Sequence, residues 1–387
     1  MMTSAEIPLS LYIHIPWCEK KCPYCDFNSH ENQQNFDEPA YIKALLDDLD
    51  QDLEIFNEIS NKPIHSVFIG GGTPSLFSAT AYQQLFKELQ QRLDLSNAEI
   101  TLEANPSSSE QAKFSGYLDA GINRLSIGTQ SYNPIMLKRL GRVHNQHDAM
   151  TAVKSAKQAG FARINLDIMF ALPEQTLAQS IEDIEQAIAF APEHISCYQL
   201  TLEPNTLFFQ QKPALPNNEL AWTMQQALQQ KLFAAGYEQY EVSAYAQKNQ
   251  QCRHNLNYWQ FGDYLGIGAG AHGKITLASG QIKRYWKQKQ PKKYLQSASS
   301  ADRLGGLSTL ANNSIAFEFM LNALRLKKGF SSDLFQARTG LTLASIENTL
   351  NKHCSTELLT QLKGRIQPTN KGYQFIDSML NDYLPES

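Results

Sequence analysis

Cys18-Glu-Lys-Lys-Cys22-Pro-Tyr-Cys25 places three cysteines within eight residues, with the spacing C-x3-C-x2-C. An apolar, strand-like run, residues 9–15, precedes this stretch, and a polar segment follows it. A loop that leaves a strand can fold its thiolates around one centre, and thiolates are the protein ligands of iron–sulfur clusters. Three thiolates leave one iron of a four-iron cluster open to bind another molecule. The spacing therefore indicates a cluster that takes part in chemistry or ligand exchange.

Two other interpretations of these cysteines stay open from the residues alone. They could form a disulfide and a free thiol, although nothing else in the chain is typical of a secreted protein. They could also bind zinc, with His14 or His30 as a fourth ligand. Solvent exposure influences the potential of a cluster, and four aromatic or proline neighbours would shield one here. These neighbours are Pro16, Trp17, Pro23 and Tyr24.

The composition is that of a folded protein with a sizeable core. The chain has 387 residues, a length that is enough for two or three domains. Of these residues, 42% are hydrophobic and 19% are charged. The formal net charge of -4 disfavours a nucleic-acid surface. No apolar run approaches the roughly 20 residues that cross a bilayer, and the first residues lack the pattern of a signal peptide. We expect a cytoplasmic protein without a transmembrane segment, in which Cys197, Cys252 and Cys354 are small buried side chains.

Strand-like and helical stretches alternate through the first half of the chain. The predicted strands cover residues 9–15, 64–69, 99–103, 123–127, 162–169 and 194–200. The predicted helices cover residues 39–59, 79–93, 107–120, 149–159, 177–190 and 219–235. Six strand–helix units indicate a parallel sheet with right-handed crossovers, either doubly wound or an incomplete barrel. In both arrangements functional residues lie at the carboxyl ends of the strands.

Polar motifs follow the predicted strands. Gly70-Gly-Gly-Thr-Pro-Ser75 would let a ligand approach the backbone closely, but it lacks the lysine of a phosphate-binding loop. Glu103 could bind ribose hydroxyls, cap a helix or form a salt bridge. Arg142 could bind a carboxylate or lie in solvent. Asp167 lies in an apolar run and needs a partner there.

The second half contains an aromatic motif, a glycine-rich segment and a helical end. In Cys252-Arg-His254-Asn-Leu-Asn-Tyr258-Trp259, the histidine could be an ordinary core residue or an axial heme ligand. The five glycines of residues 262–273 could pack against a flat ligand. Helices are expected at 314–326 and 343–351, followed within 364–375 by a hairpin with an Asn-Lys-Gly turn. This end resembles a winged helix, which we interpret as a lid or docking domain.

Taken together, the cysteine motif and the motifs after the strands resemble the radical S-adenosylmethionine (SAM) superfamily. Within it, the chain is similar to the oxygen-independent coproporphyrinogen III dehydrogenase group, and especially to its HemW-type heme chaperone branch. The resemblance implies an α/β fold: a partial (β/α)6 barrel, then a smaller, mainly helical C-terminal domain with a winged-helix-like hairpin. We expect the barrel in residues 1–236, a linking segment in 237–307 and the C-terminal domain in 308–387.

The resemblance also implies site residues. It assigns a 4Fe-4S cluster to Cys18, Cys22 and Cys25, and heme to His254, Tyr258 and Trp259. In the dehydrogenase, the positions that correspond to Gln130, Arg142 and Asp167 lie near a second SAM, with Tyr24 in the cluster loop. The full set implied for SAM is Tyr12, Tyr24, Gly71, Gly72, Thr73, Glu103, Gln130, Arg142 and Asp167.

Two functions follow from the resemblance. The first is a heme chaperone that passes heme to an acceptor protein, for example in a respiratory complex, with an electron donor for the cluster. The second is the dehydrogenase itself, which uses a SAM-derived radical. Phe27 stands where the dehydrogenase branch has a fourth cysteine, and the chain begins almost at its first strand, without the N-terminal segment that helps to enclose the substrate. We therefore expect the chaperone and assign no catalytic residue, while cleavage of SAM stays open.

Overall fold

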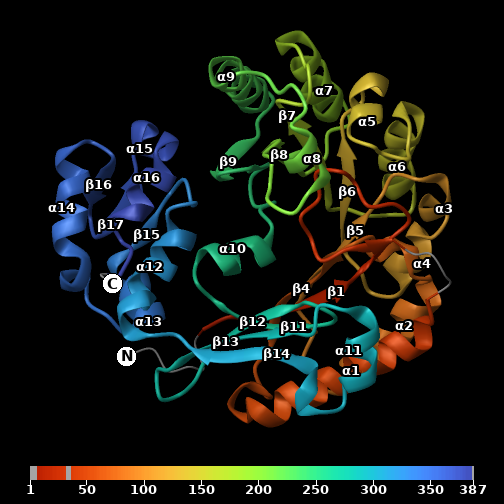
Figure 1. The fold of residues 1–387 in the computed structure, drawn as a ribbon, viewed down its shortest axis with the longest axis horizontal. Helices are drawn as coiled ribbons and strands as arrows, with labels where there is room; N and C mark the ends of the chain where they lie inside the picture. Colours follow the sequence, from red (N-terminus) through yellow and green to blue (C-terminus); the bar gives the residue numbers. More distant parts are fainter. Residues whose placement is uncertain (1–6, 32–35, 386–387) are drawn as a thin grey trace.

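The computed structural model describes residues 7–31 and 36–385 and is built around one large curved sheet (Figure 1). Six parallel strands form its centre: β1 (Leu9–Ile15), β4 (Ile64–Gly71), β5 (Glu99–Ala104), β6 (Arg124–Gln130), β7 (Ile164–Phe170) and β8 (His194–Gln199). They lie side by side in this order. The six predicted strands are therefore confirmed, with ends that shift by a few residues.

Helices cover the outer face of this sheet (Figure 1). The main ones are α1 (Glu38–Ile55), α2 (Ala79–Leu89), α4 (Phe114–Asp119), α6 (Gln146–Gln158), α7 (Leu177–Ala189) and α9 (Asn218–Ala234). Side-chain caps start several of them, as when Asp37 accepts a hydrogen bond from the Ala40 amide at the start of α1. The single helix predicted over 107–120 is wrong, because that segment forms two short helices, α3 (Ser108–Gln111) and α4.

Strand β1 shows how the sequence separates the two faces of the sheet. Leu9, Leu11, Ile13 and Ile15 are fully buried in the outer core against the helices. The alternate residues face the interior: the Ser10 and Ser66 hydroxyls lie 2.8 Å apart, and the rings of Tyr12 and Phe68 stack. Because side chains alternate along a strand, the set that faces the helices is apolar, whereas the interior set combines polar and aromatic residues.

The segment 237–307 extends both edges of the same sheet. Strands β9 (Glu238–Glu241) and β10 (Ala244–Ala246) continue it beyond β8. Strand β11 (Asp263–Ile267) pairs in parallel with β1, and β12 (His272–Thr276), β13 (Ile282–Lys287) and β14 (Leu304–Thr309) follow outward. In the described part of the chain the order runs from β14 to β9 without closing, which confirms a partial barrel.

A buried charge cluster fastens β13 to α1. The Lys287 ammonium lies 2.6 Å from an Asp52 carboxylate oxygen, and the Arg303 guanidinium lies 2.9 Å from Asp48. All four side chains are buried. The Tyr294 hydroxyl also donates to Asp48, at 2.7 Å. Since buried charges must be paired, this cluster fixes the added strands against the first helix.

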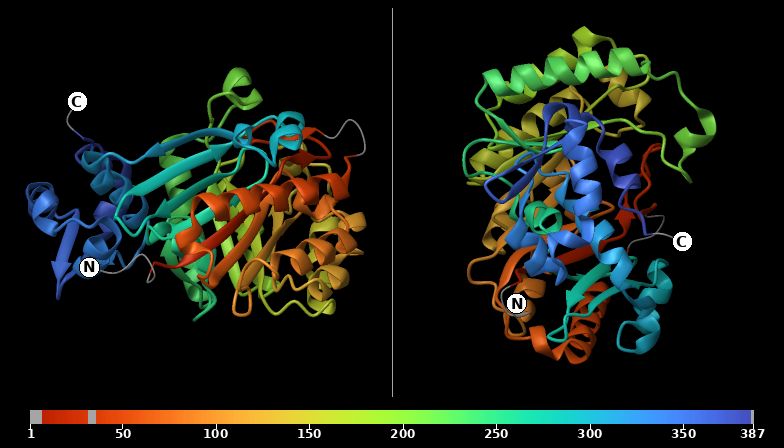
Figure 2. Two further views of the ribbon diagram at one scale, coloured as in Figure 1. Left: turned by 90° about the horizontal axis from the view of Figure 1, so that it is seen from below. Right: turned by 90° about the vertical axis from the view of Figure 1, so that its left-hand side faces the viewer.

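The C-terminal unit lies to one side of the large sheet in Figure 1 and in the left view of Figure 2, and in front of it in the right view of Figure 2. It consists of a three-stranded sheet and surrounding helices: β15 (Phe330–Ser331), β16 (Leu359–Leu362), β17 (Arg365–Pro368), α12 (Asn312–Ala323), α13 (Ser332–Thr339), α14 (Glu347–Ser355), α15 (Asn370–Gln374) and α16 (Ile376–Asn381). The hairpin predicted within 364–375 is wrong: the hairpin of this unit joins β16 to β17 through a Lys363-Gly364 turn, in which both residues have positive φ. The predicted Asn-Lys-Gly turn is wrong, because Thr369 caps helix α15 there.

Candidate functional site

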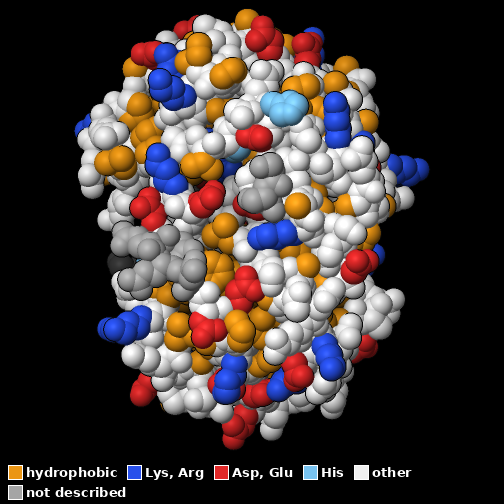
Figure 3. All heavy atoms as spheres, turned by 90° about the vertical axis from the view of Figure 1, so that its right-hand side faces the viewer, with side chains coloured by type: hydrophobic (Ala, Val, Ile, Leu, Met, Phe, Trp, Pro, Cys, Tyr) orange, Lys and Arg blue, Asp and Glu red, His pale blue; other side chains and the backbone are white. Residues whose placement is uncertain are grey.

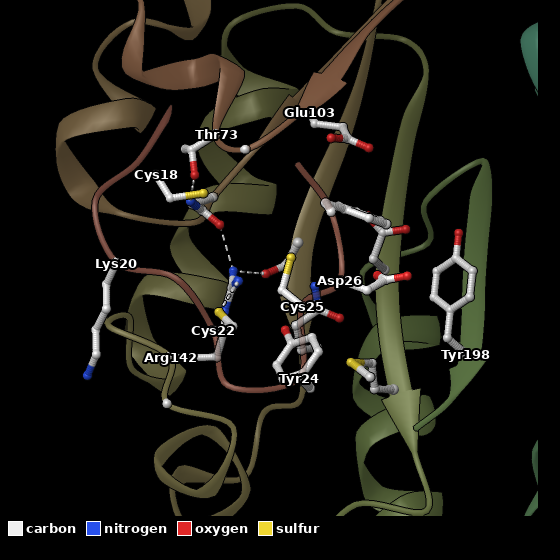
Figure 4. Close-up of a pocket in the computed structure, with 18 of the residues that line it drawn as sticks. Cys18, Lys20, Cys22, Tyr24, Cys25, Asp26, Thr73, Glu103, Arg142 and Tyr198 are labelled. Atoms are coloured by element: carbon white, nitrogen blue, oxygen red, sulfur yellow. Dashed lines mark hydrogen bonds between the residues drawn. The ribbon is translucent and has the colours of Figure 1, made fainter. Parts of the chain in front are cut away.

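A cavity of about 380 Å³ opens at the carboxyl ends of the parallel strands (Figure 4). This size is typical of small-molecule sites. The cysteine loop forms one wall, and the carboxyl ends of β4, β5, β6, β7 and β8, with the segments after most of them, form the rest. Most of the residues implied for the cluster and SAM line it: Cys18, Cys22, Tyr24, Cys25, Gly71, Gly72, Thr73, Glu103, Gln130, Arg142 and Asp167.

The three cysteines come together at this cavity as free thiols. Cys18 ends the short strand β2 (Trp17–Cys18), which pairs with β3 (His30–Glu31), so both ends of the loop are held. The Lys21 ammonium donates to the carbonyl oxygens of Phe27 and Ser29, each at 3.2 Å. The loop therefore has an ordered course between its two ends.

The donor set fits a four-iron cluster. Three cysteine thiols line this cavity, and thiolates are the protein ligands of iron–sulfur clusters. Burial raises the pKa of the Cys18 thiol to about 11, and burial also raises the pKa of Cys25. Thiols with a raised pKa lose their protons only when they bind a strongly binding metal centre. Three thiols around an otherwise open cavity leave room for a further ligand beside such a centre.

The glycine motif joins the cysteine loop to the sheet. The Gly72 amide donates to the Ile15 carbonyl and the Thr73 amide to the Trp17 carbonyl, both at 2.7 Å. A Cβ on Gly72 would lie 2.5 Å from the Trp17 carbonyl oxygen, and Gly71 has φ +115°. The glycines are thus required by the close packing of the chain on itself. Gly71 and Gly72 also line the cavity, so their predicted contact with a ligand stays a prediction.

Two carboxyl groups lie deeper in the cavity. Glu103 accepts a hydrogen bond from the Gly71 amide at 3.1 Å, and burial followed by the charge of Asp167 raises the pKa of Glu103 to about 8. Asp167 accepts from the Ser126 hydroxyl and the Asn165 amide, both at 2.9 Å. Burial also raises its pKa. A cationic ligand would stabilise the ionised form of both groups.

Arg142 and Asn105 lie between the carboxyl groups and the cysteine loop. The Arg142 guanidinium donates to Asn105 Oδ1 at 2.6 Å, and the Asn105 amide donates to Thr73 Oγ1 at 3.1 Å. Asn105 was not among the predicted site residues, although it lies just beyond the predicted strand 99–103. The sequence analysis also missed Tyr198, which lines the cavity and is 40% exposed.

Tyr12 lies outside the set that lines the cavity. Its hydroxyl is 3.0 Å from His14 Nδ1, and His14 Nε2 is 2.9 Å from the carbonyl oxygen of Asn28. The Asn28 amide in turn donates to the carbonyls of Ala269 and Lys289, each at 2.9 Å. Tyr12 therefore connects the barrel interior, through His14, to the cysteine loop and the added strands.

The aromatic motif forms helix α10 (Arg253–Trp259), which lies inside the barrel, away from the cavity lining. His254 is 1% exposed, and its ring contacts those of Tyr12, Phe68 and Tyr258. Its Nδ1 is 3.0 Å from the Ser66 hydroxyl, while its buried Nε2 has no partner within the described residues. Burial lowers the pKa of His254 to about 3, so the ring is neutral and can act as a metal ligand.

The other two residues of the motif border a second, small cavity of about 150 Å³ beside the C-terminal unit. Tyr258 and Trp259 line it, and the Arg325 guanidinium lies 4.3 Å from the centre of the Trp259 ring. The glycines of 262–273 pack on the chain itself: a Cβ on Gly266 or Gly268 would meet backbone of His272 or His14. Gly262 also lines the second cavity, so the packing of this segment against a flat ligand stays a prediction.

Comparisons with known proteins agree with this architecture. A sequence model of the Radical SAM superfamily matches residues 12–190, and one of the HemN C-terminal domain matches residues 310–375. The chain is 46% identical over 381 residues to the protein named heme chaperone HemW of Haemophilus influenzae, covering 98% of each chain. It is 44% identical to the protein of the same name in Escherichia coli, covering 98% of this chain and 99% of that one.

A solved structure shows the same fold. Coproporphyrinogen III oxidase HemN of Escherichia coli, described as a radical SAM enzyme, superposes with a TM-score of 0.82. The match covers 98% of this chain and 90% of that chain, at 22% sequence identity. The partial barrel and its C-terminal unit are thus those of a known architecture.

Proposed function

This chain belongs to the HemW family of the radical SAM superfamily, and from this premise we propose that it binds heme and delivers it to an acceptor protein. The observation that carries the proposal is His254, a buried neutral imidazole whose Nε2 has no partner within the described residues. Histidine nitrogen is a common axial ligand of heme iron. The names of the full-length relatives support heme as the cargo.

The position of His254 sets a condition for heme binding. Its ring is enclosed by Phe68, Tyr12 and Tyr258, so iron reaches Nε2 only when α10 moves away from β1 and β4. That movement breaks two buried hydrogen bonds of α10, from His254 to Ser66 and from Asn257 to Ser10. We propose that α10 opens to receive heme and that Tyr258 and Trp259 contact the porphyrin.

The cavity serves the cluster and SAM in this proposal. Cys18, Cys22 and Cys25 would hold a 4Fe-4S cluster, which can supply one electron to SAM when both are bound. The carboxyl groups of Glu103 and Asp167 would bind the cationic and hydroxyl-bearing parts of SAM. Tyr24 and Gln130 line the same cavity, and Gln130 has φ +64°, a strained conformation typical of functional sites. Tyr12 would connect this cavity with α10.

The remaining partners are proposed from the same chemistry. An acceptor protein, for example of the respiratory chain, would take the heme, and a one-electron donor would reduce the cluster. On the face shown in Figure 3, basic and acidic side chains are interspersed, which fits a protein partner better than nucleic acid. No helix within the described residues is long and apolar enough to cross a membrane. We propose the cytoplasm as the compartment, because cluster thiolates must stay reduced.

Heme transfer tests the proposal. Protein loaded with one equivalent of heme is mixed with heme-free apomyoglobin, and the Soret band of each species is followed after rapid separation. A chaperone gives up its heme to the acceptor faster than the same amount of heme bound to serum albumin does. Heme that stays on the protein, or that binds no better than to albumin, contradicts the proposed function.

A further inference from the structure

Arg142 brings a positive charge to the cavity wall, and no carboxylate of the described residues forms an ion pair with it. Its guanidinium donates to Asn105 Oδ1 at 2.6 Å, to the Gly128 carbonyl at 2.8 Å and to the Cys22 sulfur at 3.6 Å (Figure 4). The first two acceptors are neutral. Cys22 is the one of the three that becomes an anion, since a thiol loses its proton when it binds a metal centre. The Arg142 guanidinium is therefore in position to stabilise a thiolate at Cys22.

Most N–H groups of the Arg142 side chain donate hydrogen bonds to other residues of this protein. A guanidinium has five N–H groups. Asn105 and Gly128 use both hydrogens of Nη2, and Cys22 uses one hydrogen of Nη1. Nε is buried and has no partner within the described residues. A guanidinium binds a carboxylate in a bidentate manner through Nε and Nη2 or through Nη1 and Nη2. Both arrangements need a hydrogen of Nη2, and both hydrogens of Nη2 are already used here. The side chain is held toward the cysteine loop.

We propose that Arg142 is a positioning residue for the cluster: its guanidinium, oriented by Asn105 and Gly128, donates to the Cys22 thiolate and raises the reduction potential of the cluster. Reduction adds one negative charge to the cluster, and a nearby cation that donates to a ligand sulfur stabilises that charge. Hydrogen bonds to the sulfurs are among the factors that set cluster potentials. This role holds whether heme or another molecule is the cargo.

The role differs from the one implied by the resemblance, where this arginine lies near a second SAM. In that arrangement, loss of Arg142 weakens SAM binding. In the arrangement proposed here, loss of Arg142 changes the cluster potential and leaves the number of bound SAM molecules unchanged. The two roles therefore have separate measurable consequences.

The test is a dithionite titration of reconstituted protein, with the reduced cluster followed by electron paramagnetic resonance. Arg142→Gln is expected to lower the midpoint potential by about 59 mV or more, which is a tenfold change in the reduction equilibrium. Arg142→Lys keeps the charge but not the oriented donor, and its midpoint should fall between the two. Arg139→Gln is the matched control, since Arg139 bonds to Pro173 and Glu174, away from the cluster loop.

Each outcome decides the matter. A lowered midpoint in Arg142→Gln, with the Arg139→Gln midpoint unchanged and SAM stoichiometry preserved, supports the proposal. An unchanged midpoint in a fully loaded Arg142→Gln protein, or a loss of bound SAM without a shift, overturns it. If Arg142→Gln holds no cluster, Arg142→Lys carries the test, and a midpoint equal to that of the parent overturns the proposal.

Discussion

The rings of Tyr12 and His254 lie 6.4 Å apart, centre to centre, in the interior of the barrel. Tyr12 belongs to β1 and is linked through His14 to Asn28 in the cysteine loop. His254 belongs to α10, which begins at Arg253. Two side chains, Tyr12 and His14, therefore link the candidate heme ligand to the candidate cluster loop. A change at one of these sites can reach the other through direct contacts.

Replacement of His254 should weaken heme binding. In His254→Ala the iron loses its nitrogen ligand, so the dissociation constant should rise at least about tenfold, or about 1.4 kcal/mol. Heme titration followed by the Soret band measures this. The exposed His147 provides the control, since His147→Ala removes a surface imidazole and should bind heme as the parent does. Equal affinity in the two variants would remove His254 from the site.

Replacement of Cys22 should prevent cluster assembly. A serine hydroxyl does not replace a thiolate as a ligand of iron–sulfur clusters, so reconstituted Cys22→Ser should lose most of its iron and its visible absorption. Cys354→Ser is the control, because Cys354 lies in the C-terminal unit on α14. Iron and sulfide analysis gives the result. Retention of parental cluster content in Cys22→Ser would contradict the ligand assignment.

Binding of SAM should release a proton from Glu103 near neutral pH. Burial and the charge of Asp167 raise the pKa of Glu103 to about 8, so the group is mostly protonated at pH 7 in the empty cavity. A bound cation favours the ionised form and lowers that pKa, so affinity should increase as pH rises from 6 to 8, the range below the folded pKa. Calorimetry in buffers with different ionisation enthalpies counts the proton.

The variant Glu103→Gln provides the control for this effect. It keeps the size of the side chain and removes the titrating group, so the proton release and its share of the pH dependence should disappear. If parent and variant release the same number of protons, another group is responsible and the assignment of Glu103 to the SAM site is wrong.

Breaking the buried charge cluster should destabilise the fold. Lys287→Met leaves Arg303 as the one cation of this cluster for the carboxylates of Asp48 and Asp52, and removal of one partner from a buried ion pair costs about 3–5 kcal/mol. Urea denaturation should show the loss. Lys43→Met removes an exposed pair with Asp47 and should change the free energy of unfolding by less than about 1 kcal/mol. Similar losses in both variants would contradict a structural role of the buried cluster.

The parts of the fold that depend on local pattern were predictable from the sequence. The apolar run Leu9–Ile15 and the spacing of Cys18, Cys22 and Cys25 are features of short stretches: the strand is confirmed, and the three cysteines line one cavity. A hairpin was predicted around Asn370-Lys-Gly because these residues have the composition of a turn, whereas the hairpin of this unit turns at Lys363-Gly364. Tertiary context makes the Asn370-Lys-Gly segment a helix, with Thr369 as its cap.

The remaining features depend on contacts between distant residues. Lys287 and Asp48 are separated by 239 positions, and no local pattern pairs them. The parallel pairing of β11 with β1 joins residues such as Leu9 and Asp263. The contact of Arg142 with Cys22 likewise needs the barrel to bring its two sides together. Motif resemblance named both residues but could not reveal that they touch.

The most direct test of the central claim is one anaerobic assay with the reconstituted protein. Reductant, SAM and either heme or coproporphyrinogen III are added. The Soret band is followed by absorbance, and protoporphyrinogen IX and 5′-deoxyadenosine by mass spectrometry. A heme carrier should bind heme stably and form no porphyrin product. Product that accumulates beyond one equivalent would show that Phe27 does not prevent the chemistry and that the protein is a dehydrogenase.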